Sequence, residues 1–187
     1  MPNYRFPKPY ADAVARLRVP SGFLLLTAFA WLSRPSEDSL LRGIPISLLG
    51  LALRAWAAGH LAKNERLVDS GPYRHTRNPL YLGTLITAMG LAVAAQSWWV
   101  GGIFAAVFVL IYLPVMELEE QHLRTLFPAY NAYADSVPLL IPRFPGIASA
   151  VSFSRELYLR NEEYQALAGF LLSVAYLWWR SGVEIPL

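Results

Sequence analysis

Apolar residues fall into five runs that alternate with polar segments along the chain. The runs cover residues 19–33, 44–62, 79–95, 98–116 and 164–179. Each is slightly shorter than the ~20 residues that a helix needs to cross a bilayer, and flanking aromatic and polar residues can supply the remaining length. Core helices of soluble proteins are also apolar, but the polar segments of this chain are too short to cover five of them. The pattern therefore predicts an all-α integral membrane protein, a single domain over residues 1–187 with five transmembrane helices.

The polar segments predict how these helices are connected. Residues 1–18 form a polar N-terminal arm, residues 63–78 a basic loop, and Gln96-Ser97 a tight turn that makes a hairpin of the third and fourth helices. Residues 117–163 form a long polar segment, with a helix expected over Glu117–Tyr133 and an extended proline-rich stretch after it. A secretory signal is an alternative interpretation of the first run, but further apolar runs follow it.

Composition supports the membrane prediction and excludes several kinds of site. Hydrophobic residues make up 55% of the chain and charged residues 16%, with a mean hydropathy of +0.35. Soluble domains carry about 25% charged residues. The chain has no cysteine, which excludes disulfides, thiolate metal sites and a cysteine nucleophile. The net charge of +3, without a dense lysine or arginine run, gives no indication of nucleic-acid binding.

Positive charges and tryptophans both predict an orientation. Twelve Lys and Arg residues lie in the arm, the basic loop and the 117–163 segment, so a cytoplasmic N-terminus places all of them inside. The C-terminus then lies outside, together with Arg34, Arg42 and Arg180. The tryptophans that would form an aromatic belt at the outer interface are Trp31, Trp98, Trp99, Trp178 and Trp179.

Charged residues near the apolar runs are candidates for chemistry. Arg54 lies inside the second run, where a charge is costly and usually faces a polar cavity or a partner. A purely structural role for it, holding helices together through a carboxylate, stays open. Glu117, Glu119 and Glu120 repel one another unless cations or donors are near. The Glu-x-x-His spacing of Glu119 and His122 is not repeated, as a di-metal helical bundle would require, so no metal is expected.

Two separated patterns carry a family resemblance. Residues 71–83 read Gly-Pro-Tyr-Arg-His-Thr-Arg-Asn-Pro-Leu-Tyr-Leu-Gly, with Pro79 suited to the first turn of a helix. Taken alone, this stretch is also typical of a basic loop at a membrane surface. The second pattern is Glu119-Glu120, Leu123, Phe127-Pro128, Tyr130, Tyr133 and Val137-Pro138. Together they resemble the isoprenylcysteine carboxyl methyltransferase family, within a broader group that takes in phospholipid N-methyltransferases, over roughly residues 44–165.

The chain departs from that family at two places. Where the family commonly has Arg-His-Pro, this chain has Arg77-Asn78-Pro79. This variant is similar to bacterial members, and His75 is available nearby. This variant leaves open which side chain takes the role of the histidine. Phe127-Pro128 replaces the Phe-Gly of the family, and this change is expected to alter only the local turn. The resemblance to bacterial members implies the bacterial inner membrane.

The resemblance implies a methyltransferase that uses S-adenosylmethionine and releases S-adenosylhomocysteine. The cofactor would bind at the cytoplasmic face, in a pocket formed by the 63–83 loop and the 117–163 segment. The acceptor would be a lipid-like or prenylated small molecule, with a carboxylate favoured, that enters from membrane lipid. The implied cofactor-binding residues are Tyr73, His75, Arg77, Asn78, Tyr81, Glu119, Glu120 and Tyr133. The implied catalytic residues are Arg54, Arg160, Asn161 and Glu163.

Individual roles follow as hypotheses. Tyr81 and Asn78 would contact the adenosyl part, Glu119 or Glu120 the ribose hydroxyls or the ammonium, and Arg77 the carboxylate of the cofactor. No Gly-x-Gly-x-x-Gly follows a strand, which agrees with binding outside a Rossmann domain. Two alternatives stay open: an NADPH-dependent membrane reductase of the sterol reductase type, and a non-enzymatic membrane scaffold or transport subunit.

Overall fold

The computed structural model describes residues 6–143 and 152–182, and within these residues every regular element is helical. This confirms the all-α prediction for the described part of the chain. The long helices are α1 (Lys8–Leu32), α2 (Glu37–Ala58), α3 (Pro79–Ala94), α4 (Trp98–Val107), α5 (Leu113–Leu126) and α8 (Tyr164–Ser181). A π-helical turn, η2 (Phe108–Tyr112), joins α4 to α5. The short elements are a 3₁₀ turn, η1 (Gly71–Arg74), and the helices α6 (Tyr130–Ser136) and α7 (Arg155–Arg160).

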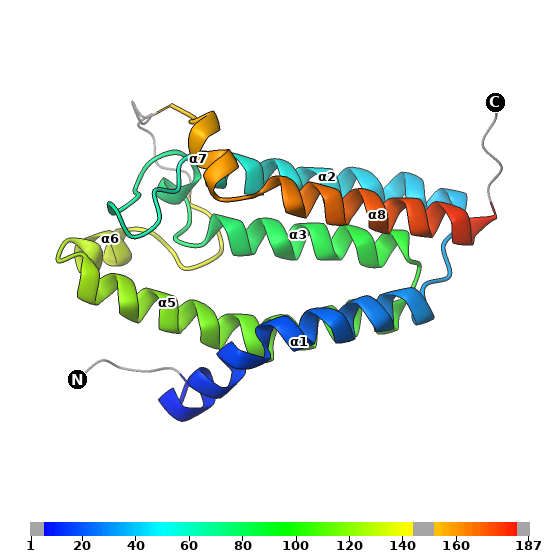
Figure 1. Cartoon of the computed structure of the whole chain (residues 1–187), viewed down its shortest axis with the longest axis horizontal. Helices are drawn as coiled ribbons and strands as arrows, with labels where there is room; N and C mark the ends of the chain where they lie inside the picture. The colour runs from blue at the N-terminus through cyan, green and yellow to red at the C-terminus, as the bar shows by residue number, and fades with distance from the viewer. Residues whose placement is uncertain (1–5, 144–151, 183–187) are drawn as a thin grey trace.

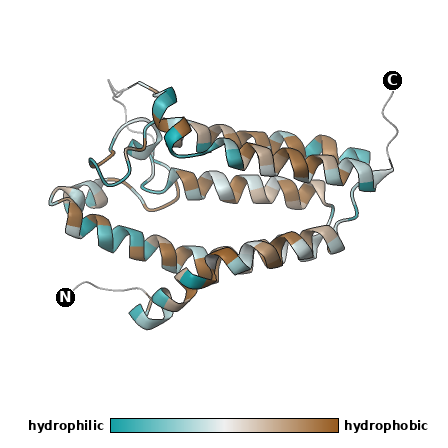
Figure 2. Cartoon of the chain, viewed as in Figure 1, coloured by the Kyte–Doolittle hydropathy of each residue, from teal (hydrophilic) through white to brown (hydrophobic). Residues whose placement is uncertain are grey.

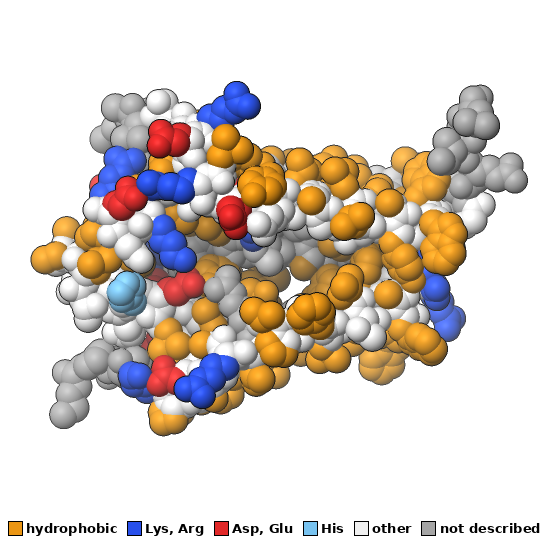
Figure 3. Space-filling view, viewed as in Figure 1, with side chains coloured by type: hydrophobic (Ala, Val, Ile, Leu, Met, Phe, Trp, Pro, Cys, Tyr) orange, Lys and Arg blue, Asp and Glu red, His pale blue; other side chains and the backbone are white. Residues whose placement is uncertain are grey.

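The long helices run side by side in two layers (Figure 1). Helices α2, α3 and α8 form one layer, and α1 with the continuous α4–η2–α5 helix forms the other. Hydrophobic residues follow the helices, whereas hydrophilic residues concentrate at the end that carries α6, α7 and the long loops (Figure 2). Most of the visible Lys, Arg, Asp and Glu side chains gather at this end (Figure 3), which we call the loop end. The other end has only short connections.

Two helices are long and apolar enough to cross a membrane, α2 and the continuous 29-residue helix Trp98–Leu126. Helix α1 makes a third candidate if its two parts, Lys8–Leu17 and Val19–Leu32, which meet at 56°, are one span. Helix α3 is apolar but shorter. Each predicted apolar run lies largely in one long helix, while the number of five spans stays a prediction.

Two helix boundaries differ from the prediction because of local sequence effects. Helix α2 begins at Glu37 rather than at residue 44, because Ser36 caps it through a reciprocal bond pair with Ser39 and acidic residues fill its first turn. The predicted helix Glu117–Tyr133 is wrong as one element: α5 ends at Leu126 and α6 begins at Tyr130. Pro128 explains the break, since the residue before a proline avoids the helical conformation.

The N-terminal arm, predicted only as polar, is helical from Lys8 and contacts the π-helical turn. The hydroxyl of Tyr10 donates a hydrogen bond of 2.6 Å to the carbonyl oxygen of Leu110. Pro114 has no N–H to offer this carbonyl, as residue i+4 of a regular helix would. The tyrosine therefore satisfies a backbone group that the proline leaves without its helical donor.

Helices α2 and α3 pack through glycines at very short range. A Cβ atom built on Gly50 would lie 2.5 Å from the backbone nitrogen of Thr87, and one on Gly90 would collide with Ser47. The hydroxyl of Ser47 also donates to the carbonyl of Thr87 at 3.0 Å. Small residues and hydroxyl bonds are the usual means of close helix packing in membranes. This pair of helices fixes the position of Arg54 relative to the start of α3.

Candidate functional site

The two sequence patterns lie side by side at the loop end. The backbone nitrogen of Arg77 donates to the carbonyl of Pro138 at 2.9 Å, and that of Arg143 donates to the carbonyl of His75 at 2.9 Å. His75 also places Nδ1 3.0 Å from the carbonyl oxygen of Arg143. Gly71 starts this loop with a φ of 56°, and a Cβ there would lie 2.6 Å from the His60 ring. The loop therefore requires a glycine both for its conformation and for space.

Arg77 joins the two patterns through a nearly buried ion pair with Glu120. Its Nε lies 2.7 Å from one carboxylate oxygen and Nη2 lies 3.3 Å from the other, with side chains 14% and 12% exposed. Nη1 donates to the carbonyl oxygens of Ala134 and Val137. A bidentate, charge-assisted pair of this kind fixes geometry. Arg77 and Glu120 thus hold the 71–78 loop, α5 and the end of α6 in one arrangement.

The neighbouring polar residues differ in how deeply they are buried. The side-chain amide of Asn78 donates to the carbonyl of Leu139 at 3.2 Å, and the hydroxyl of Tyr133 donates to the carbonyl of Tyr73 at 2.6 Å. Glu119, by contrast, presents an exposed side chain one residue before the buried Glu120. Of the predicted carboxylate pair, only Glu119 is placed at the surface.

Burial raises the pKa of three tyrosines in this cluster, Tyr73, Tyr130 and Tyr133. For Tyr73, the negative charges of Glu163 and Glu119 raise the pKa further, while the positive charge of Arg54 lowers it. These effects show that the Tyr73 phenol lies within electrostatic reach of Arg54, Glu163 and Glu119. The phenols stay neutral over the physiological range.

This shift predicts a loss of stability in alkali. A buried tyrosine whose pKa is raised contributes stability that is fully present below the unfolded pKa of about 10 and that falls as the pH rises above it. We expect the free energy of unfolding of the detergent-solubilised protein to decline above about pH 10, with a shallower decline in Tyr133→Phe. Tyr164→Phe, a change at an exposed tyrosine, is the control. An equal slope in Tyr133→Phe and wild type would contradict this expectation.

Arg54 has the buried partner that a charge inside a span requires. Its Nε and Nη2 lie 2.5 and 3.0 Å from the two carboxylate oxygens of Glu163, and Nη1 donates to the hydroxyl of Thr84. The two charged side chains are 23% and 8% exposed. The pair links α2 to the start of α8 and, through Thr84, to α3.

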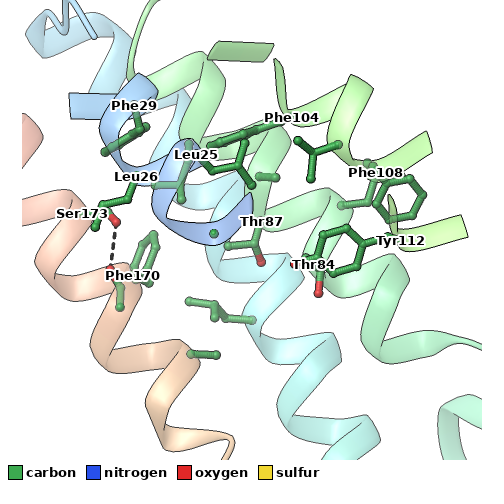
Figure 4. Close-up of a pocket in the computed structure, with 18 of the residues that line it drawn as sticks. Leu25, Leu26, Phe29, Thr84, Thr87, Phe104, Phe108, Tyr112, Phe170 and Ser173 are labelled. Carbon is green, nitrogen blue, oxygen red and sulfur yellow. Dashed lines mark hydrogen bonds between the residues drawn. The ribbon is translucent and has the colours of Figure 1, made fainter. Parts of the chain in front are cut away.

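A cavity of about 390 Å³ between the helices reaches Arg54 of this ion pair. Helices α1, α2, α3, α4 and α8 and the η2 turn all contribute to its wall, and Figure 4 shows that the labelled side chains are mostly apolar. Its polar lining comes from Arg54, Thr84, Thr87, Tyr112 and Ser173. The cavity is therefore apolar along most of its wall and has Arg54 as its charged lining residue. We call it the Arg54 cavity.

Sequence reasoning missed Tyr112 and Thr84. The π-helical turn ends at Tyr112, whose ring meets that of the buried Tyr81 edge-on, with centroids 5.9 Å apart. Such turns are frequent at functional sites because they re-aim one side chain. Pro114, at the end of an apolar run, was the feature that could have indicated an irregular helix here. Nothing in the pattern distinguished Thr84 from other small polar residues.

Two of the predicted catalytic residues lie away from the Arg54 cavity. Arg160 pairs with Glu65 at 2.9 Å, and both side chains are largely exposed. The amide of Asn161 donates to the carbonyl oxygens of Ala58 and Leu61 at 3.0 and 2.9 Å, at the end of α2. These bonds anchor the turn that precedes Glu163.

The predicted cofactor pocket is not confirmed. The structure brings the two segments into contact, but neither the Arg54 cavity nor a second cavity of about 730 Å³ is lined by residues 63–83 or 117–163. Within the described residues, no group of three His, Asp or Glu side chains is arranged to hold a metal ion.

The central part of the chain matches a known family. The family model for phospholipid methyltransferases matches residues 46–129, which contain Arg54, the 71–83 stretch and Glu119-Glu120. Residues 46–129, a little less than half of the chain, are thus similar to phospholipid methyltransferases. This confirms the resemblance drawn from the two motifs, and it indicates a membrane methyltransferase.

Two curated bacterial proteins are similar to this chain. The cobalt-zinc-cadmium resistance protein CzcN of Cupriavidus metallidurans is 35% identical over 106 residues, 54% of this chain and 49% of CzcN. The nickel-cobalt-cadmium resistance protein NccN of Alcaligenes xylosoxydans xylosoxydans is 30% identical over 115 residues, 60% of this chain and 53% of NccN. The chain thus spans about half the length of these relatives. No solved structure matches it.

Proposed function

We propose that the protein is an integral-membrane methyltransferase that uses S-adenosylmethionine to methylate a lipid-like acceptor. One observation carries the proposal: in a chain whose centre is similar to methyltransferases, an apolar cavity between helices has Arg54 in its lining, and Arg54 pairs with Glu163 at the start of α8. An acceptor with an apolar chain and a polar reactive group matches both parts of that site.

The chemistry of the cavity favours a carboxylate acceptor. Arg54 is the charged residue of its lining, and its positive charge attracts a carboxylate. Because Nε and Nη2 already hold Glu163, the acceptor would take the remaining N–H groups of the guanidinium or displace Glu163. A carboxylate is already a nucleophile, so it requires orientation and the exclusion of water rather than a base. An amine acceptor would require a proton acceptor, and Glu163 is the carboxylate beside Arg54 that fits this role.

The loop end offers groups that suit the cofactor. S-adenosylmethionine supplies an electrophilic methyl group on a sulfonium. The exposed carboxylate of Glu119 can accept bonds from ribose hydroxyls or from the ammonium. Arg77 pairs with Glu120, and Asn78 donates to Leu139. We therefore assign these side chains to positioning the loop rather than to direct contact with the cofactor.

The other predicted residues take supporting roles in this proposal. Tyr133 holds the backbone of Tyr73, and His75 holds Arg143. The ring of Tyr81 packs edge-on against Tyr112, which lines the Arg54 cavity. Asn161 positions Glu163 through its bonds to the end of α2. Arg160, in its exposed pair with Glu65, serves as part of the rim of the loop end.

We place the loop end in the cytoplasm of a bacterial cell, with five spans formed by α1, α2, α3, α4–η2–α5 and α8. Charged side chains concentrate at that end (Figure 3), as the positive-inside rule requires. At the opposite end, the backbone nitrogen of Arg34 donates to Ala95 and the guanidinium of Arg180 donates to Ser33, both at 2.8 Å. The side chain of Trp98 is 97% exposed at this end, as expected of an aromatic belt.

Calorimetric titration in detergent tests the cofactor. We expect S-adenosylhomocysteine to bind with measurable heat and NADPH to give none. Glu119→Gln should weaken binding by about tenfold, because one charge-assisted hydrogen bond is lost. Glu156→Gln, a change of an exposed carboxylate on α7, should leave it unchanged. Heat with NADPH alone would favour the reductase, and heat with neither ligand would favour a scaffold.

The acceptor can be classified from the product. After transfer of a labelled methyl group to membrane extracts, treatment with base releases methanol from an ester only. The names CzcN and NccN describe metal resistance rather than a reaction, so they do not select an acceptor. Methanol release would assign an O-methylated carboxylate, whereas a base-stable product would exclude the ester and favour an acceptor methylated on nitrogen or sulfur.

A further inference from the structure

A second cavity lies at the end opposite the loop end. Its volume is about 730 Å³, and α3 and α4 form most of its wall, with the first turns of α2 at its rim. Its polar lining comes from Ser39, Arg42, Gln96 and Ser97, and the rest is apolar. We call this space the Arg42 groove.

The groove has the depth of one membrane leaflet. Its lining on α3 extends from Leu85 to Gln96 just beyond the helix, a distance of about 16 Å at 1.5 Å per residue. That is about half of the ~30 Å hydrocarbon core of a bilayer. The polar rim stands beside Trp98 and Trp99, which are 97% and 76% exposed, as residues of an interfacial belt are. The groove therefore runs from the headgroup level to about the bilayer centre.

The rim carries a positive charge available to a ligand. Arg42 is the charged residue among those that line the groove. Its contact with Asp38 is 3.5 Å long, and the two side chains are 73% and 78% exposed. Exposed pairs of this kind contribute little, so the guanidinium can turn to a better anion at small cost. A phosphate diester accepts two parallel bonds from a guanidinium.

We propose that the Arg42 groove binds one anionic glycerophospholipid from the leaflet at this end. An acyl chain lies along Leu85, Met89 and Ala92, and the phosphate lies at Arg42 and Gln96. The site is separate from the Arg54 cavity, although Leu85, Ala88 and Phe104 line both spaces. The lipid therefore packs against the outer side of the wall that bounds the Arg54 cavity, and its binding does not depend on methyl transfer.

Native mass spectrometry of the purified full chain in detergent tests this proposal. Phosphatidylglycerol should be retained as one bound lipid per chain, and phosphatidylcholine about tenfold less. Arg42→Gln should reduce phosphatidylglycerol retention by about tenfold, since it removes the charge at the rim. Arg34→Gln, at an exposed arginine of the same end outside the groove, should not change it.

Two variants that add bulk to α4 test the groove independently of charge. Ala105 and Ala106 are both exposed on α4, but only Ala105 lines the groove. Ala105→Phe should fill the groove and abolish retention, whereas Ala106→Phe should preserve it, with circular dichroism confirming that both variants fold. Equal retention of the two lipids, or equal effects of Arg42→Gln and Arg34→Gln, would overturn the proposal. Chain dimers that Ala105→Phe dissociates would overturn it in favour of a second copy in the groove.

Discussion

Replacing Glu163 by glutamine is expected to lower kcat/KM for methyl transfer by about 100-fold or more, on the scale of removing one electrostatic group from an active site. It should also destabilise the protein, because Arg54 would stay charged and partly buried without its carboxylate. Breaking a buried pair from one side typically costs roughly 3–5 kcal/mol. Methyl transfer assays and thermal unfolding in detergent measure the two effects.

A double variant separates the structural role of this pair from its chemical role. Arg54→Met with Glu163→Leu removes both charges and leaves apolar side chains, a replacement that is often neutral or stabilising. We expect the double variant to regain thermal stability but not methyl transfer. Recovery of activity along with stability would show that the pair only holds α2 and α8 together.

Alanine at Gly90 should be the second severe change, because it separates α2 from α3. A Cβ atom there would lie 2.6 Å from the carbonyl oxygen of Gly43 and still closer to Ser47. Backbone atoms cannot yield as a flexible side chain can, so we expect a loss of roughly 1–3 kcal/mol or more of unfolding free energy. Unfolding in mixed micelles, followed by circular dichroism, measures this loss.

The matched control is not expected to lose stability. Gly102 lies in α4, and a Cβ atom built on it meets no atom within 4 Å. Alanine is intrinsically better than glycine in a helix by about 1 kcal/mol. Gly102→Ala should therefore leave stability unchanged or raise it slightly. Equal effects at Gly90 and Gly102 would contradict the close contact of α2 with α3.

The sequence predicted the helices well and their ends poorly. The apolar runs and Pro79 predicted where α3 begins and where the main helices lie, because burial in lipid requires long apolar segments. The start of α2 at Glu37 depends on the reciprocal bonds of Ser36 and Ser39, and the break between α5 and α6 depends on Pro128. These are local effects that hydrophobicity does not report, although the residues that cause them are visible in the sequence.

The sequence identified residues of the candidate site but not the contacts between them. The motifs selected Arg77 and Glu120, but only the fold shows that they pair with each other, while their predicted contact with a cofactor stays a prediction. Arg54 was expected to need a partner, and Glu163 is that partner across a separation of 109 residues. Tyr112 was missed because its direction depends on a π-helical turn.

The sequence by itself determined that the chain is helical, with apolar helices long enough to span a membrane, and that its centre is similar to phospholipid methyltransferases, since apolar run length and motif order are both properties of the chain. Only the tertiary structure decided which charges pair, which face a cavity and which stay exposed. The reason is physical: a buried charge takes the partner that close packing brings within hydrogen-bond distance. Here the glycines between α2 and α3 set that packing, and with it the position of Arg54 beside Thr84.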